Sequence, residues 1–102
     1  MPRKKCFRLC RLLDNEKIFK PQGLPLSSLE IIEIYIDEFE AVRLIDYEGF
    51  SQIEGADKMK ISRSSFQRIL ESGRKKILDA LINNKALKIT NQINNYILED
   101  LK

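Results

Sequence analysis

The chain has 102 residues, of which 43% are hydrophobic and 32% charged, with a formal net charge of +3. This length allows one domain with a modest core and excludes two independent domains. No apolar run is long enough to span a bilayer and no secretory segment is recognisable, so we expect a cytoplasmic protein with reduced cysteines and no membrane partner.

The charges are strongly segregated along the chain. Residues 1–26 carry seven basic and two acidic side chains, residues 27–57 carry one and nine, and residues 58–76 carry seven and one, while the remainder is neutral. Because the local field governs encounter with a polyanion more than the total charge does, this segregation favours a nucleic-acid partner. A basic membrane-surface helix is the weaker alternative, since the first twenty residues lack a sustained apolar face.

The N-terminal block is predicted to be a basic arm that leads into a linker rich in proline and glycine over residues 20–25. Its first cations, Arg3, Lys4 and Lys5, could contact DNA phosphates or a minor groove, or could form a solvated tail. The sequence alone leaves both interpretations open.

Two cysteines, Cys6 and Cys10, stand in this arm. The chain has no histidine and no further cysteine, so one copy cannot complete a four-ligand zinc site. Apolar packing of the two thiols is the favoured interpretation, and a metal site shared by two copies is a minor alternative. We therefore expect no cofactor.

After the linker, the alternation of Ile32, Ile34 and Ile36 with polar or aromatic residues predicts a short strand, for which Ala86–Ile89 is the candidate partner. A helix is predicted next, with Asp37 as its N-cap and Glu40 completing a capping box.

A second helix is predicted from Ser51, whose hydroxyl can cap it, with Glu54 as the reciprocal acceptor of a capping box. Ala56 is small enough for a close helix crossing, and Ile53 and Met59 are expected to supply apolar contacts beneath the following turn.

Two residues oppose this local pattern. Lys60 occupies a turn position where glycine commonly adopts a left-handed conformation, at a cost of about 1 kcal/mol. Gly55 inside the helix costs a similar ~1 kcal/mol relative to alanine.

A third, longer helix is predicted from a cap at Ser62. Steps of three, four and seven residues define one apolar stripe that should be buried: Phe66, Ile69, Leu70, Ile77 and Leu81.

The opposite face of this third helix is polar and cationic, as in a recognition helix that enters a DNA major groove. Arg63, Ser64 and Gln67 are the candidates for base edges, because arginine pairs with guanine and glutamine with adenine. The candidates for phosphate contacts are Ser65, Arg68, Arg74, Lys75 and Lys76, together with Ser51 and Gln52 at the positive end of the preceding helix. Such a face can also be merely solvated.

The final twelve residues place Ile93, Ile97, Leu98 and Leu101 at helical spacing. An isolated helix of that length is unstable in water, so this stripe should cover its own domain or contact a second copy.

Several segments resemble a known family: FKPQGLPLSSLE, then IDEFEAVRLIDYEGF followed by SQIEGADKM, and most specifically SRSSFQRILESGRKKI. They are similar to the small prokaryotic proteins of the UPF0251 (DUF134) family, a likeness that covers roughly residues 2–89. The resemblance implies a DNA-binding helix-turn-helix like region 4 of sigma factors. It also implies a recognition helix that begins over residues 62–68. Family members usually have alanine in place of Gly55 and glycine in place of Lys60.

The sequence thus predicts a mainly α fold: a three-helix helix-turn-helix domain over residues 27–90 with a short two-stranded β pairing, preceded by the arm and linker of residues 1–26 and followed by an amphipathic helix over residues 91–102. We expect a sequence-specific reader of double-stranded DNA that acts as a transcriptional regulator, with DNA and a second copy in a dimer as its partners. The alternative is an adaptor that binds transcription machinery through the acidic surface of residues 30–48. No catalytic constellation is recognisable, so we expect no enzyme.

Overall fold

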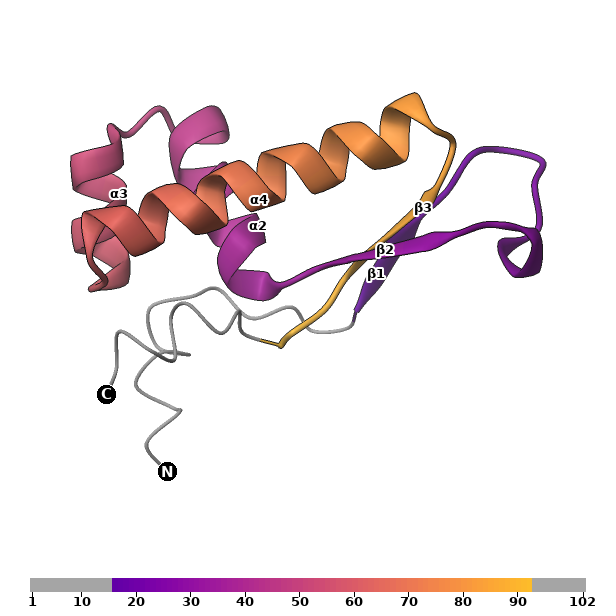
Figure 1. Ribbon diagram of the computed structural model, residues 1–102, viewed down its shortest axis with the longest axis horizontal. Helices are drawn as coiled ribbons and strands as arrows, with labels where there is room; N and C mark the ends of the chain where they lie inside the picture. Colours follow the sequence, from indigo (N-terminus) through magenta and orange to yellow (C-terminus); the bar gives the residue numbers. More distant parts are fainter. Residues whose placement is uncertain (1–15, 93–102) are drawn as a thin grey trace.

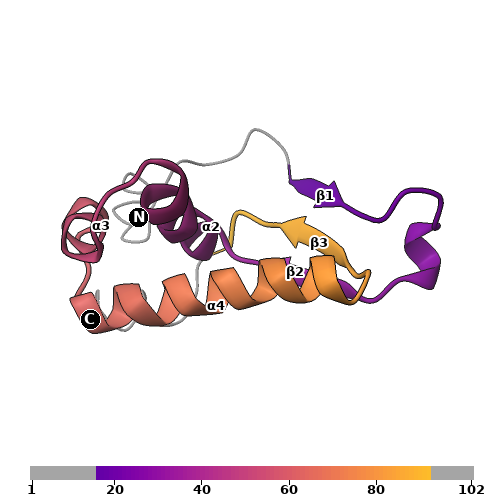
Figure 2. The ribbon, with the colours of Figure 1, turned by 90° about the horizontal axis from the view of Figure 1, so that it is seen from above.

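The computed structural model describes residues 16–92, and within that range three α-helices and a three-stranded sheet form a mainly helical fold. The longest helix, α4 (Arg63–Ile82), runs along the molecule, with α2 and α3 at its beginning and the sheet beside its end (Figures 1 and 2). The fold class expected from the sequence is confirmed. Of the predicted C-terminal helix, residues 93–102 lie outside the described residues.

The sheet contains β1 (Lys17–Phe19), β2 (Ile31–Ile34) and β3 (Ala86–Ile89), with β3 in the centre. β3 pairs in parallel with β2 and antiparallel with β1. The predicted pairing of Ala86–Ile89 with the strand after the linker is therefore confirmed. The third strand, β1, was not predicted and falls inside the range predicted as arm and linker. Its three residues are all exposed and show no alternating pattern that would indicate a strand.

The helix α2 (Ile36–Val42) begins two residues earlier than predicted. Its N-cap is Tyr35, whose backbone N–H donates to Glu38 Oε1 over 2.9 Å, so the prediction of an Asp37 cap with Glu40 in the box was wrong. Ile36, which follows the cap, is completely buried, and its place in the core fixes where the helix starts. Asp37 lies in the first turn instead and is buried.

A π-helical turn, η2 (Arg43–Tyr47), continues α2. The Arg43 guanidinium spans this turn, donating to Glu40 at 2.7 and 2.9 Å and to Glu48 at 2.6 Å. Helices α2, α3 and α4 enclose the main core together with η2. Its buried members are Ile36, Ala41, Leu44, Ala56, Met59, Phe66, Ile69 and Leu70.

The short helix α3 (Gln52–Met59) has the predicted capping box. Ser51 Oγ accepts from the Glu54 N–H at 3.1 Å, and the Glu54 carboxylate accepts from the Ser51 N–H at 2.9 Å. Met59 is buried as predicted, but Ile53 is 58% exposed, so its predicted core contact was wrong. With only eight residues, α3 presents one narrow face to the core, and Ile53 lies outside it.

Two glycines permit the close contacts that hold α4 in place. A Cβ on Gly55 would lie 2.4 Å from Cζ of the fully buried Phe66, so this glycine makes room for the ring. A Cβ on Gly73 would lie 2.9 Å from the carbonyl oxygen of Glu38 and 2.9 Å from Val42 Cγ2. Gly73 therefore marks the crossing of α2 and α4.

The predicted apolar stripe of α4 is buried only along its first half. Phe66, Ile69 and Leu70 are fully buried, Ile77 is half-buried, and Leu81 is 71% exposed. The prediction for Leu81 was wrong because α4 leaves the three-helix core beyond the α2 crossing and continues beside the small sheet (Figure 2).

Candidate nucleic-acid interface

The start of α4 is fixed by a three-residue turn after α3. Lys60 has φ 60° and ψ 43°, the left-handed conformation expected there, and the Ile61 N–H donates to the Ala56 carbonyl at 3.2 Å. Ser62 then caps α4, its Oγ accepting from the Ser65 N–H at 3.1 Å. This short connection sets the direction in which α4 leaves the core.

The first two turns of α4 have one buried and one exposed face. Phe66 and Ile69 anchor the buried face, and full burial of one such side chain contributes roughly 1.5–3 kcal/mol. The exposed face carries Arg63, Ser64, Gln67 and Arg68. The first turn of α4 contains no acidic residue, so the positive end of the helix dipole and the Arg63 guanidinium reinforce each other.

On this exposed face, Gln67 and Ser64 make short-range contacts. Gln67 Nε2 donates to Glu71 Oε2 at 3.2 Å, and Ser64 Oγ lies 3.3 Å from Ser62 Oγ. A single exposed hydrogen bond of this kind contributes little net free energy, so Gln67 can exchange it for another partner.

Three residues predicted to contact phosphates are placed elsewhere. Ser65 is only 6% exposed. Arg74 makes a two-pronged ion pair with Asp46, with N–O distances of 2.8 and 2.9 Å. Lys76 turns inward to Glu38. We therefore leave these three out of the candidate interface, whereas Lys75 is exposed and stays in it.

The contacts of Lys76 form a buried polar network between α2 and α4. Its Nζ lies 2.8 Å from Oε1 of the completely buried Glu38 and 4.3 Å from the centre of the Tyr35 ring. The same carboxylate accepts the Ser72 hydroxyl at 2.5 Å and the Tyr35 N–H. The Lys76 charge is thus used to satisfy a buried acid.

The acidic block of residues 30–48 is largely neutralised within the chain. Besides the Glu38 network, Glu40 and Glu48 both bind Arg43, whose pKa is raised above its ordinary value chiefly by the hydrogen bonds it donates to Glu40. The hydrogen bond from Arg74 holds the pKa of Asp46 below its ordinary value. Much of this block is therefore engaged within the chain, while Glu30 and Glu33 are exposed.

The beginning of α3 presents Ser51 and Gln52, both exposed. The Ser51 hydroxyl and N–H are already engaged with Glu54, and those bonds lower the pKa of the Glu54 carboxyl, the backbone bond most strongly. A carboxylate at this position competes with a phosphate for the helix end. Gln52 is thus the better placed of the two for a phosphate contact.

Sequence analysis missed two further cations near this end of the molecule. Lys60 is exposed in the turn that precedes α4, and Lys58 is exposed on α3 with its Nζ 4.5 Å from the centre of the Phe50 ring. Both belong to the basic block of residues 58–76, and this could have indicated them as candidates for phosphate contacts. Lys60 was instead interpreted only as an unfavourable turn residue.

The predicted arm residues Arg3, Lys4 and Lys5 and the cysteines Cys6 and Cys10 lie outside the described residues. Within residues 16–92, no cluster of metal-binding side chains is present, and no helix has the length and apolar character to cross a membrane.

Comparison with known proteins places this chain in a family. The model of the family described as "Protein of unknown function DUF134" matches residues 1–96. The chain belongs to the DUF134 family. Within it, the chain is 49% identical to a UPF0251 protein of Caldanaerobacter subterraneus subsp. tengcongensis, over 87% of this chain and 75% of that relative.

Similar DUF134 relatives occur in other prokaryotes. A UPF0251 protein of a Thermoanaerobacter species is 46% identical over 87% of this chain and 79% of the relative. One of Methanococcus vannielii is 46% identical over 80% of this chain and 65% of the relative. No solved structure matches this chain significantly. The family resemblance stated from the sequence is confirmed, while its implied likeness to sigma factor region 4 stays a prediction.

Proposed function

We propose that this DUF134 protein is a sequence-specific double-stranded DNA-binding protein, acting as a transcriptional regulator, which places the first turns of α4 in the major groove. The observation that carries the proposal is the exposed face of Arg63, Ser64 and Gln67, directly after a tight turn and backed by a fully buried face. A recognition helix in a helix-turn-helix needs this division.

Each exposed residue has a proposed role. The Arg63 guanidinium would pair with guanine O6 and N7, and Gln67 would release Glu71 to pair with adenine N6 and N7. Ser64 would contact a base edge or a phosphate. The proposed phosphate contacts come from the surrounding exposed residues: Gln52, Lys58, Lys60, Arg68 and Lys75.

The adaptor alternative is less well supported. It requires an acidic docking surface, yet Glu38 and Glu40 are buried and Asp46 and Glu48 are held in ion pairs. The proposal includes no catalytic step, and it assigns the protein to the cytoplasm, where its DNA would be.

Selection from a random duplex pool tests the proposal directly. We expect the full chain to enrich one sequence motif, and its affinity for that motif to fall steeply as salt rises, because each phosphate contact releases counterions. A salt titration on unselected duplex should show weaker binding with a similar slope. Absence of an enriched motif, or binding that does not respond to salt, would contradict the proposal.

A further inference from the structure

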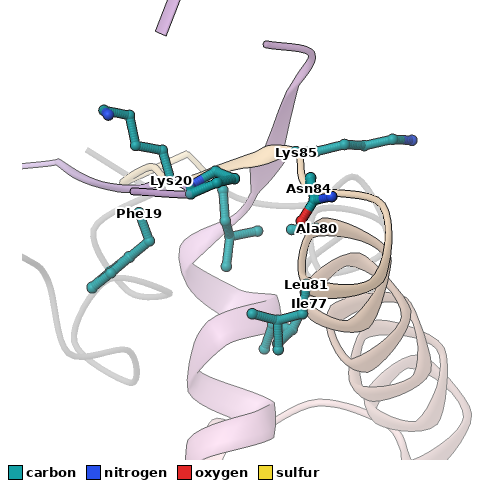
Figure 3. Close-up of a pocket in the computed structure, with 9 residues that line it drawn as sticks. Phe19, Lys20, Ile77, Ala80, Leu81, Asn84 and Lys85 are labelled. Carbon is teal, nitrogen blue, oxygen red and sulfur yellow. The ribbon is translucent and has the colours of Figure 1, made fainter. Parts of the chain in front are cut away.

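An apolar groove lies at the end of the molecule opposite to the candidate DNA interface. It has a volume of about 320 Å³ and is formed by the end of α4 on one side and by β1, β3 and the residues after β1 on the other. Phe19, Ile77 and Leu81 supply much of its apolar surface (Figure 3). Phe19 is 59% exposed and Leu81 71% exposed, so solvent reaches both walls.

The charged groups at the rim point away from this groove. In Figure 3 the amino groups of Lys20 and Lys85 extend outward from the apolar side chains. Lys20 Nζ donates to the Leu24 carbonyl at 2.7 Å, and Lys85 Nζ lies 3.1 Å from Asp79 Oδ2. Asn84 is the other polar residue among those that line the groove, and the rest of the lining is apolar, so the groove suits apolar side chains.

A protruding apolar ridge stands next to the groove on the same helix. Leu78 and Ile82, four residues apart, are 55% and 71% exposed. Leu78 is three residues before Leu81, which lines the groove, so the two side chains are neighbours on the helix surface. A monomer rarely exposes this many large aliphatic side chains at one place unless the place is an interaction site.

We propose that the occupant of this groove is the Leu78 and Ile82 ridge of a second copy of the same chain. A two-fold axis pairs the same patch on both subunits, so a ridge beside a groove of matching chemistry is self-complementary: each copy fills the groove of the other. This dimer surface is independent of the proposed DNA binding, and neither its formation nor its test requires DNA.

The charges around the ridge favour a second copy over a nucleic acid. Around the ridge and groove, the three acids Glu30, Glu71 and Asp79 balance Lys20, Lys75 and Lys85, so two such faces approach without net repulsion. Near Arg63, by contrast, the excess of cations would repel a second copy. Leu81 follows Arg63 by 18 positions, roughly 27 Å along the helix, so a dimer formed here leaves the first turns of α4 uncovered, while Lys75 lies at the edge of the ridge.

The test combines two charge variants of the full chain with a mixing step. Leu78→Glu alters the ridge and Phe19→Lys alters the groove, and both residues are more than half exposed, so folding should be retained. By sedimentation equilibrium, the wild type should be a dimer, and each variant alone should dissociate at least about tenfold more readily. Tyr47→Glu, at an 84% exposed site on η2, is the control that should leave the dimer intact.

An equimolar mixture of the two variants should regain dimer mass. In that heterodimer one contact joins an unaltered ridge to an unaltered groove, and the other places Glu beside Lys. A monomeric wild type would overturn the proposal and assign the groove to another occupant, such as a different protein or residues 93–102. Variants that still dimerise, or a mixture that does not recover, would also overturn it.

Discussion

The two halves of α4 lie in one continuous helix, and both contribute to the basic block of residues 58–76, but they present different surfaces. In the first half, Arg63 and Gln67 are exposed on a face with no acidic residue in its first turn. In the second half, Arg74 and Lys76 are held by Asp46 and Glu38, and the exposed Lys75 is followed by three exposed aliphatic side chains, those of Leu78, Leu81 and Ile82.

This difference shows that a count of positive charges does not locate a polyanion-binding surface. The sequence contains seven basic residues in this block, but acids from α2 and η2 engage two of them. Which cations remain available to bind DNA depends on which helices pack together. Variants of the cations that acids engage and of the cations that remain exposed should therefore behave differently.

The largest effect is expected from Lys76→Met. This change removes the partner of the buried Glu38 carboxylate, and breaking a buried pair commonly costs 3–5 kcal/mol; we expect roughly 2–3 kcal/mol, because Ser72 and the Tyr35 N–H still bind that carboxylate. Urea unfolding measures it. Lys75→Met at the neighbouring exposed position is the matched control and should change the stability by less than about 0.5 kcal/mol. Equal losses of stability in the two variants would contradict the role of Lys76 as the partner of the buried Glu38.

A smaller effect of opposite sign is expected from Lys60→Gly in the turn that orients the first half of α4. Lys60 adopts a left-handed conformation that costs a non-glycine residue about 1 kcal/mol, so the free energy of unfolding should rise by about that amount. Thermal unfolding provides the measurement, with Lys58→Gly inside α3 as a control that should destabilise. A loss of stability in Lys60→Gly would show that the lysine makes a contact that outweighs the strain.

The smallest effect concerns the exposed Asp46 and Arg74 pair. Because its pKa is lower in the folded state than the ordinary value of 3.8, Asp46 stabilises the fold above that pH, and this contribution is lost as the pH falls through the folded-state pKa. Asp46→Asn should therefore lower stability at neutral pH by less than about 1 kcal/mol, since solvent screens the pair.

The pH dependence of that difference provides the check. Denaturant unfolding of wild type and Asp46→Asn should converge as the solution is acidified to about pH 2. A difference that persists unchanged in acid would mean that Asp46 stabilises the protein by a route other than its charge.

Features with local causes could be predicted from the sequence. The Ser51 and Ser62 caps, the Ser51 and Glu54 box and the left-handed Lys60 each depend on residues within a few positions, and all are present. The pairing of β2 with β3 was also predictable, because alternating isoleucines follow the linker and a second short segment, Ala86–Ile89, follows the long helix.

Features that depend on distant packing were missed. The burial of Ile36 moved the start of α2 ahead of Asp37, and the crossing at Gly73 carried α4 away from the core and left Leu81 exposed. The partners of Arg74 and Lys76 stand 28 and 38 residues away, so no local pattern could separate these cations from Arg63. For that reason the predicted phosphate set includes two cations that acids of the fold engage.

The most direct test of the division within α4 compares two arginines on the selected duplex. Arg63→Ala should weaken binding by roughly 1–3 kcal/mol and relax the preference at one base position, while Arg74→Ala should retain affinity within about threefold. Fluorescence anisotropy with wild type, both variants and single-base variants of the site provides the measurement. Equal losses for the two variants, or an unchanged affinity in Arg63→Ala, would contradict the account.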